Sequence, residues 1–326
     1  MRQNDARFEP FTPKLMWQEA APHTWPAAII PVLLAVALCA GPTAHIDVLT
    51  VNVLLAICVL MQASVNTFND YYDYIKGADT VENSSDDASD AIFVHYNIDP
   101  KSGLAFAVGL LAAAFALGIY IIAIAGAVPF AIALVGAFFV AAYSAGKTPL
   151  SYYPVGEAVS GFVMGGLITL ACVYVLSGTF DSSVLLYALP CIIGIGLIMM
   201  TNNTCDIEKD IDAHRLTLPV VLGRQRAVKA YRALLALWVS CLIVLSFVHA
   251  RASGYDFADA LAAGLITIPA TLLIAYPTFR AIGVMNPLIA RTRDAAMPQI
   301  LNLNVTLGLG YIVTLLMPSV FSIGWF

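Results

Sequence analysis

The residues best suited to chemistry are the asparagines and aspartates of a segment near position 70. Asn66, Asp70 and Asp73 stand at positions i, i+4 and i+7, and Asn69 lies between them. If the segment is helical, the first three side chains share one face. Like charges on one helical face are destabilising unless another group neutralises them. This face is therefore expected to meet a cation.

A second segment repeats the pattern. Asn202, Asp206 and Asp210 stand at i, i+4 and i+8, again on one helical face, and Asn203 follows the first of them. Carboxylate and amide oxygens are ligands that suit Mg²⁺, which keeps coordination sites open for phosphate oxygens. Two such clusters facing each other would clamp a diphosphate carried by metal ions. The alternative is that both are solvated loop acids just outside a membrane.

The composition indicates that these segments belong to a membrane protein. The 326 residues are 60% hydrophobic and 11% charged, with a mean hydropathy of +0.82. A soluble domain carries roughly 25% charged residues, so this chain is expected to lie in the lipid bilayer. The net charge of -5 gives no reason to expect nucleic acid as a partner.

Nine apolar runs are long enough to be interpreted as membrane helices, which need about 20 residues each. The expected spans cover about residues 26–43, 48–68, 103–124, 127–145, 157–178, 184–203, 228–249, 258–279 and 300–321. The predicted fold is an all-α, multi-pass membrane bundle. A polar N-terminal segment, 1–25, precedes a single membrane-embedded domain, 26–326. Its two long polar loops are 69–102 and 203–227.

The basic residues predict how the bundle is oriented. With nine spans, all of the 16 lysines and arginines except Arg251 fall on the side of the N-terminus. Because basic residues gather on the cytoplasmic side, the N-terminus is expected in the cytoplasm and the C-terminus outside the cytoplasmic membrane. Four spans separate the two acidic segments, so both lie on the cytoplasmic side.

The two motifs resemble those of a known family. The first segment, extended to Gly77-x-Asp79, resembles the first aspartate-rich motif of the UbiA-type membrane prenyltransferases, and the second segment resembles the second motif. The Asn202-Asn203 start and the Gly77-x-Asp79 ending are similar to the branch that prenylates 1,4-dihydroxy-2-naphthoate in menaquinone biosynthesis. The stretch from Tyr143 through Pro149 to Glu157 is also similar to that branch.

The resemblance implies a reaction and a set of site residues. An aromatic acceptor would attack a polyprenyl diphosphate whose leaving group is held by Mg²⁺, the metal acting as a Lewis acid. The metal ligands implied are Asn66, Asp70, Asp73, Asn202, Asp206 and Asp210. The catalytic residues implied are Asp70, Asp73, Asp206, Asp210, Tyr143 and Lys147. The substrate-binding residues implied are Asn66, Asn69, Asn202, Asn203 and Arg215.

Three places depart from the family pattern. Ala21 and Cys205 stand where arginines are usual, and the loop 80–100 is acidic where the family is glycine-rich and basic. Each missing cation would ordinarily face phosphate, so Lys147 and Arg215 are expected to compensate.

Other functions remain open at this point. They are a prenyltransferase for 4-hydroxybenzoate or another acceptor, a non-catalytic relative, and a secondary transporter. A transporter would place its unpaired charges near the bilayer midplane, whereas the polar clusters here sit at one interface. A phosphotransferase for CDP-alcohols would show Asp-Gly-x2-Ala-Arg, a string that this sequence lacks.

Overall fold

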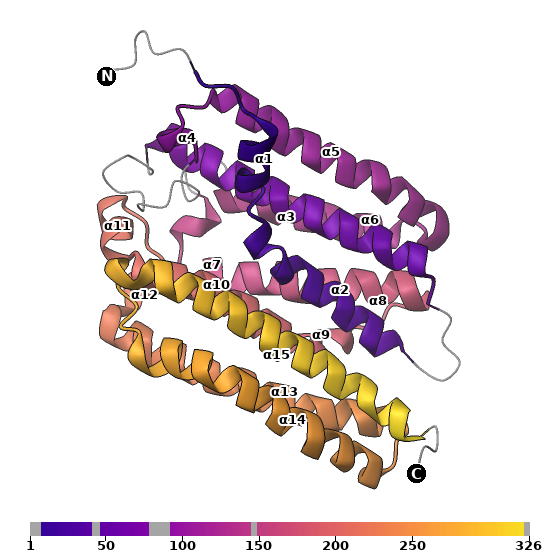
Figure 1. Cartoon of the computed structure of the whole chain (residues 1–326). Coiled ribbons are helices and arrows are strands. Elements are labelled where there is room, and N and C mark those ends of the chain that lie inside the picture. The colour runs from indigo at the N-terminus through magenta and orange to yellow at the C-terminus, as the bar shows by residue number, and fades with distance from the viewer. Residues whose placement is uncertain (1–7, 41–45, 78–91, 145–148, 323–326) are drawn as a thin grey trace.

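A computed structural model describes residues 8–40, 46–77, 92–144 and 149–322. Within these ranges the fold is all helical, and the one β-bridge is an isolated pairing of Glu9 with Ile98. The long helices run side by side along one diagonal, from α5 at one edge of the bundle to α14 at the other (Figure 1). The prediction of an all-α bundle is confirmed.

The longest helices form the frame of the bundle. They are α3 (Val48–Lys76), α5 (Pro100–Ala125), α13 (Arg224–Ala252), α14 (Phe257–Arg280) and α15 (Arg293–Ser322). Shorter helices pack between them. These are α2 (Pro26–Cys39), α6 (Val128–Ser144), α10 (Leu189–Cys205), and α7 (Gly156–Ser160), which continues through the π-helical turn η3 (Gly161–Leu167) into α8 (Ile168–Ser177).

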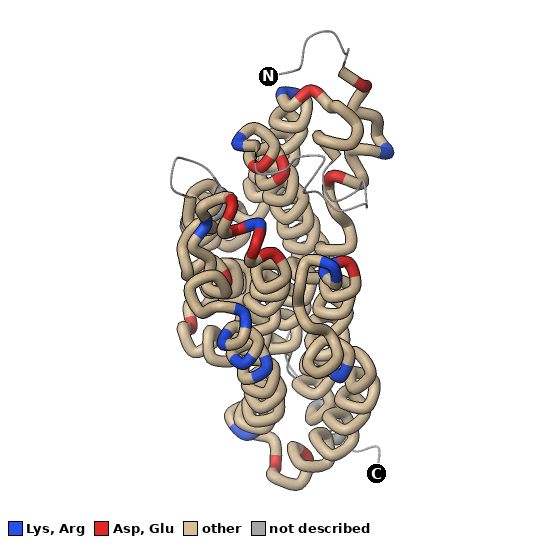
Figure 2. Tube along the Cα trace, turned by 90° about the vertical axis from the view of Figure 1, so that its left-hand side faces the viewer, with Lys and Arg blue, Asp and Glu red and all other residues tan. Residues whose placement is uncertain are grey.

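Small helices occupy the connections. They are α1 (Pro13–Glu19), η1 (Pro22–Thr24), α4 (Ile92–His95), η2 (Leu150–Tyr152), α9 (Val184–Tyr187), α11 (Ile207–Asp212), α12 (Leu218–Leu222), η4 (Ala281–Met285) and η5 (Ala290–Thr292). Both segments expected as polar loops, 69–102 and 203–227, are thus partly helical. Figure 2 faces the end of the bundle that carries α4 and α11, where acidic and basic residues lie close together.

Each expected span coincides with a helix, but the helices differ in length. Six helical segments of the described residues are long and apolar enough to cross a membrane, and a seventh is present if 13–24 and 26–39 count together across a 53° bend. The helices α6 and α10 are apolar but shorter, at 17 residues each. The protein is a multi-pass membrane protein, and the number nine stays a prediction.

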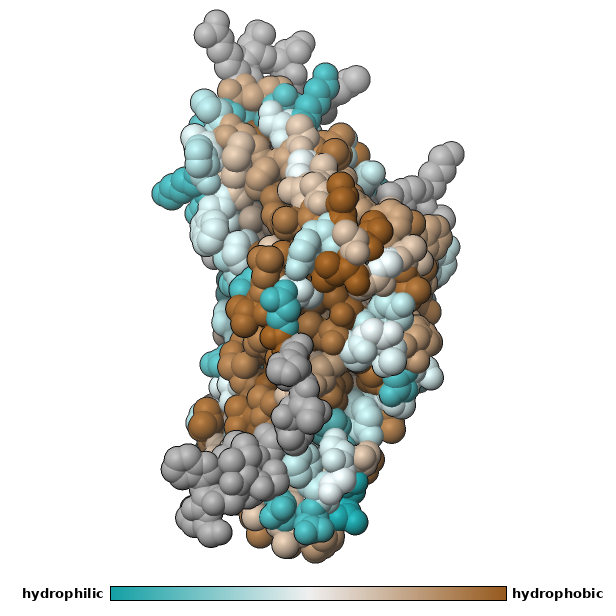
Figure 3. Space-filling model, turned by 90° about the vertical axis from the view of Figure 1, so that its right-hand side faces the viewer, coloured by the Kyte–Doolittle hydropathy of each residue, from teal (hydrophilic) through white to brown (hydrophobic). Residues whose placement is uncertain are grey.

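The outer surface and the interior of the bundle are both apolar. Figure 3 shows hydrophobic residues across much of the face that lies to the right in Figure 1. Inside, one core cluster joins α2, α10, α13 and α15 around buried Tyr231, Trp238 and Tyr311. A second joins α2, α3 and α8. An apolar exterior suits lipid as the surrounding solvent, and α2 and α10 lie at the centre.

Glycines let η3 and α10 approach each other closely. A Cβ atom added at Gly161 would lie 2.3 Å from the Ile192 carbonyl oxygen, and one added at Gly165 would lie 2.6 Å from the Ile192 nitrogen. Only residues without a side chain fit at such distances. This contact sets the position of α10, whose C-terminal end carries the second motif.

The first motif is helical as predicted. Asp47 caps the start of α3 by accepting a hydrogen bond from the Thr50 N–H at 2.8 Å. The helix continues through Asp73 and ends only at Gly77, whose φ of 70° is favourable for glycine. Because α3 is unbroken, Asn66, Asp70 and Asp73 do share one face.

The second motif is not one continuous helix, and this part of the prediction is wrong. The helix α10 ends at Cys205, Asp206 adopts φ -98° and ψ 19°, and α11 begins at Ile207. Asn202, Asp206 and Asp210 therefore do not lie on one continuous helix, because Asp210 follows the break. Arg224, at the start of α13, contacts the chain on both sides of this break.

Candidate active site

A cavity of about 470 Å³ lies between the two motif regions. Its polar rim carries residues of both motifs together with two arginines. The rim residues are Asn66, Asn69, Asp70, Asp73, Asn202, Asn203, Arg215 and Arg293. The rest of the wall is largely apolar and comes from α3, α5, α6, η3 and α8. A cavity with a polar rim and a long apolar wall suits a ligand with a charged head and a hydrocarbon tail.

Arg215 links the two motif regions. Its Nη2 lies 2.6 Å from the Asp73 Oδ1, and the two side chains are only 15% and 19% exposed. The backbone N–H of Arg215 donates a hydrogen bond to the backbone carbonyl of Asp210 at 2.8 Å. The guanidinium stacks 5.0 Å from the centre of the Tyr152 ring. Its Nε has no hydrogen-bond partner within the described part of the chain, so a donor remains for a ligand.

Arg293 holds the second motif from the start of α15. Its Nε lies 3.1 Å from the Asn202 Oδ1 and 3.3 Å from the Asp206 Oδ2. In the sequence, Arg293 is only one of the basic residues expected on the cytoplasmic side. Arg293 lies 91 residues along the chain from Asn202, so helical spacing within the motif cannot predict their contact. The cluster of basic residues before the last helix was the one clue.

Asn66 is engaged by the N-terminal turn. Its Nδ2 donates to the Thr24 Oγ1 at 2.9 Å and more weakly to the Ala20 carbonyl at 3.4 Å, while its Oδ1 accepts from the Gln62 Nε2 at 3.1 Å. The turn contains Ala21, whose φ of 47° is uncommon for alanine. Asn66 thus joins the turn of residues 20–24 to the first motif.

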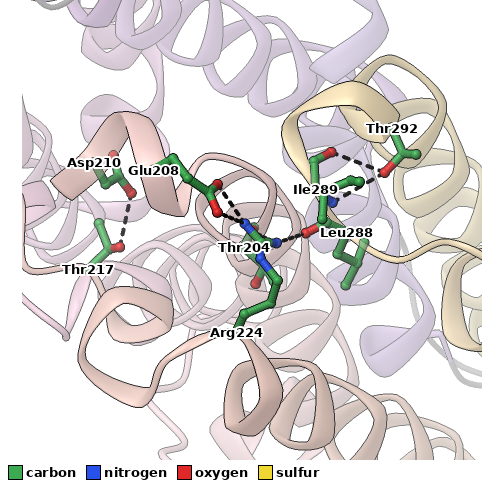
Figure 4. Close-up of polar contacts among 8 residues, drawn as sticks. All are labelled: Thr204, Glu208, Asp210, Thr217, Arg224, Leu288, Ile289 and Thr292. Atoms are coloured by element: carbon green, nitrogen blue, oxygen red, sulfur yellow. Dashed lines mark hydrogen bonds and ion pairs between the residues drawn. The ribbon is translucent and has the colours of Figure 1, made fainter. Parts of the chain in front are cut away.

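Asp210 lies behind the rim. It is only 4% exposed and accepts a hydrogen bond from the Thr217 Oγ1 at 3.0 Å (Figure 4). Burial raises the pKa of Asp210 to about 6, and the bond from Thr217 opposes the rise. Neither Asp206 nor Asp210 is among the residues that line the cavity.

The oxygen atoms at the rim suit a metal that arrives with its substrate. Within the described residues, no group of three or more His, Cys, Asp or Glu side chains could hold a metal ion. The rim instead offers amide and carboxylate oxygens from Asn69, Asp70 and Asp73. Mg²⁺ is often bound by one or two carboxylates together with phosphate oxygens rather than by an all-protein cage, and this donor set fits that arrangement.

Tyr143 also lines the cavity, next to a buried polar pair. The Asn203 Nδ2 donates to the Glu157 Oε1 at 2.8 Å, and both side chains are buried. Glu157 was noted in the sequence only as part of the third matching stretch, not as a site residue. Lys147 lies outside the described residues.

Comparison with known proteins identifies relatives over most of the chain. The UbiA prenyltransferase family matches residues 28–282. The chain is 32% identical over 234 residues to a 1,4-dihydroxy-2-naphthoate octaprenyltransferase of Bacillus subtilis, covering 71% of this chain and 74% of that protein. It is 31% identical over 268 residues to a protein of the same name from Mycobacterium tuberculosis, covering 79% and 84%.

The fold also matches solved structures. One is a UbiA homolog from Archaeoglobus fulgidus bound to GPP and Mg²⁺, with a TM-score of 0.61 and 17% sequence identity. The match covers 91% of this chain and 99% of the homolog. At this identity the likeness establishes a shared fold.

Proposed function

The chain belongs to the UbiA prenyltransferase family, and from this premise we propose that it transfers a polyprenyl group from an allylic diphosphate to 1,4-dihydroxy-2-naphthoate in menaquinone biosynthesis. The relatives at 31–32% identity carry that activity in their names. The observation that carries the proposal is the cavity, in which both motifs meet on a polar rim above an apolar wall. Such a cavity accommodates the diphosphate at one end and the prenyl chain along the other.

The rim residues have distinct roles in this proposal. Arg215 and Arg293 contribute guanidinium groups beside Asp73 and Asp206, where charge-assisted hydrogen bonds to phosphate are strong. The oxygens of Asn69, Asp70 and Asp73 would hold Mg²⁺ with its diphosphate. When bound, Mg²⁺ supplies positive charge that offsets the charge of the leaving group.

The apolar wall serves the prenyl chain and the acceptor. Phe115, Phe130 and Phe139 line the cavity together with Tyr143. Their ring faces attract positive charge that develops on the allylic carbon. A wall of hydrocarbon side chains also excludes water, which would otherwise capture the reactive carbon. We further propose that the enzyme lies in the cytoplasmic membrane with its rim and N-terminus toward the cytoplasm.

A transfer assay tests the function. Purified protein would be incubated with labelled farnesyl diphosphate, Mg²⁺, and either 1,4-dihydroxy-2-naphthoate or 4-hydroxybenzoate. We expect prenylated naphthoate, abolished by a chelator and by Asp70→Asn. The matched control is Asp181→Asn, an exposed aspartate in the connection between α8 and α9. Transfer to 4-hydroxybenzoate alone would reassign the acceptor. Absence of transfer to either ring, with the protein folded, would identify a non-catalytic relative.

A further inference from the structure

One arginine spans the break in the second motif. Arg224, the first residue of α13, donates from Nη1 to the Thr204 carbonyl at 2.9 Å, just before the break. Its Nη2 donates to both carboxylate oxygens of Glu208, at 2.8 and 2.7 Å, just after the break. Figure 4 shows the guanidinium between the two segments. A single planar group thus holds α10 and α11 on either side of Asp206.

The same guanidinium also holds the connection between α14 and α15. Arg224 Nη1 donates to the carbonyl of Leu288 (Figure 4), a fully buried residue with a φ of 52°. A bulky residue adopts this backbone conformation only when its surroundings enforce it. Here the Leu288 N–H donates to the Asn286 Oδ1 at 2.9 Å, and Thr292 donates to the same oxygen at 2.7 Å.

This turn leads directly into Arg293, the partner of Asp206. Arg224 is therefore connected to the Asp206 carboxylate by two sets of contacts. One passes through the backbone on either side of Asp206, and the other passes through the Leu288 turn to Arg293. Any movement of Arg224 would change both the position of the Asp206 side chain and the position of the cation that pairs with it.

We propose that Arg224 is a positioning residue for the transfer reaction, which fixes Asp206 relative to Arg293, a residue of the rim. The inference rests on the proposed function. Arg224 is not among the residues that line the cavity, so its effect on the reaction is indirect. The Glu208 side chain is 68% exposed, and an exposed ion pair contributes little by itself. The two carbonyl contacts carry the effect.

Lysine cannot replace this arginine. A lysine ammonium is one compact charge on a flexible stem, whereas the guanidinium presents donors in a fixed planar arrangement. Arg224→Lys keeps the charge near Glu208 but cannot bond two carbonyls and both carboxylate oxygens together. Glu208→Gln keeps Arg224 and both carbonyl contacts. Comparing the two variants therefore separates the effect of the ion pair with Glu208 from the effect of the two carbonyl contacts.

The first test compares turnover. We expect Arg224→Lys to lower kcat about 10²-fold, the cost of a displacement of roughly 1 Å at a reacting centre, with the KM for the aromatic acceptor unchanged. Glu208→Gln should lower kcat less than about tenfold. The matched control is Arg226→Ala, an exposed arginine two residues along the same helix, which should retain the parental kcat. Parental kcat in Arg224→Lys, or a loss that follows only the folded fraction in size-exclusion chromatography, would overturn the proposal.

The second test does not need turnover. Cys205 is fully buried at the end of α10, beside the break. In a variant that keeps Cys205 as its one cysteine, a water-soluble maleimide should label the thiol faster after Arg224→Lys than in the parent or after Arg226→Ala. Equal labelling rates would contradict the proposed role at the break. If the parent transfers no prenyl group, the proposed function fails, while labelling still decides whether Arg224 holds the motif.

Discussion

Arg215 and Arg293 each neutralise one aspartate, and each comes from a different part of the chain than its partner. Arg215 follows the second motif but pairs with Asp73 of the first, and Arg293 begins the last helix but pairs with Asp206. Both pairs are largely buried. Removing one partner of a buried pair costs about 3–5 kcal/mol because the other charge is left uncompensated. The pairs therefore hold the two motif regions together and also keep cations close to the site proposed for phosphate.

The first prediction at this scale concerns the affinity for the prenyl diphosphate. Arg215→Gln should raise the KM for farnesyl diphosphate by about 10- to 100-fold, because a charge-assisted contact contributes about 1.5–3 kcal/mol and about 1.4 kcal/mol is tenfold. Steady-state kinetics with varied donor would measure it. Arg232→Ala, an exposed arginine of α13, is the control. An unchanged KM would remove Arg215 from the diphosphate site and leave it with a structural role.

The second prediction concerns pH and Asp210. Burial raises the pKa of this carboxyl from 3.8 to about 6, so the folded protein holds the proton more tightly than the unfolded chain. The contribution of Asp210 to the free energy of unfolding is then full below about pH 4 and falls by at most about 3 kcal/mol as the pH rises through about 6. Asp210→Asn should flatten this dependence.

Thermal unfolding in detergent and without divalent metal would measure it. Melting temperatures would be compared across about pH 4 to 7 for the parent, for Asp210→Asn, and for Asp212→Asn as an exposed control in the same helix. The Asp212 variant should follow the parent. Identical curves for all three proteins would mean that Asp210 does not titrate in this range.

At the scale of single elements, the contact of η3 with α10 determines where the second motif lies. Gly165 packs against the backbone at Ile192, so the neighbouring atoms cannot move aside as a flexible side chain would. The third prediction is that Gly165→Ala destabilises the protein by about 1–3 kcal/mol, the usual cost of overpacking, and also lowers turnover because α10 shifts. The melting temperature and the transfer rate would both be measured.

Gly109 supplies the matched control for this substitution. It lies on the exposed side of α5, and an added Cβ would meet no atom within 4 Å. Alanine is the better helix former by about 1 kcal/mol, so Gly109→Ala should leave the melting temperature unchanged or raise it. Equal behaviour of the two variants would show that the close approach at Ile192 is not a constraint.

The two motifs differ in how well helical spacing predicts them, and the reason is physical. The periodicity of Asn66, Asp70 and Asp73 is correct because α3 continues without interruption to Gly77. The same reasoning is wrong for the second motif because the helix breaks at Asp206, where Arg224 binds the neighbouring Thr204 carbonyl. The spacing of residues within one segment cannot predict a contact that another helix makes with it. Arg293 was missed for the same reason.

At the scale of the whole molecule, hydropathy predicts where the helices lie better than it predicts how they cross. All nine expected runs coincide with helices among the described residues, but a 53° bend, next to the turn that binds Asn66, precedes the first run. The apolar composition of a run indicates that the run lies in lipid. Bends and short helices depend on the packing of neighbours, to which a hydropathy pattern is insensitive.

The fourth prediction concerns topology. If nine spans and the asymmetry of basic residues hold, alkaline phosphatase fused after the C-terminus should be active, because it folds only outside the cytoplasm. The same reporter fused after residue 252, at the end of α13, should also be active, and fused after residue 222, at the end of α12, inactive. Activity at residue 222 would contradict the proposed orientation, and an inactive C-terminal fusion would contradict the span count.

The pairing of Asp206 with Arg293 also has a consequence for biosynthesis. Translation runs from the N-terminus, so both acidic motifs are made before the helix that supplies Arg293. Until α15 is inserted, Asp206 lacks this partner and the core around Tyr231 and Trp238 lacks the helix that completes it. A nascent chain therefore cannot assemble the complete rim until its last helix is in place.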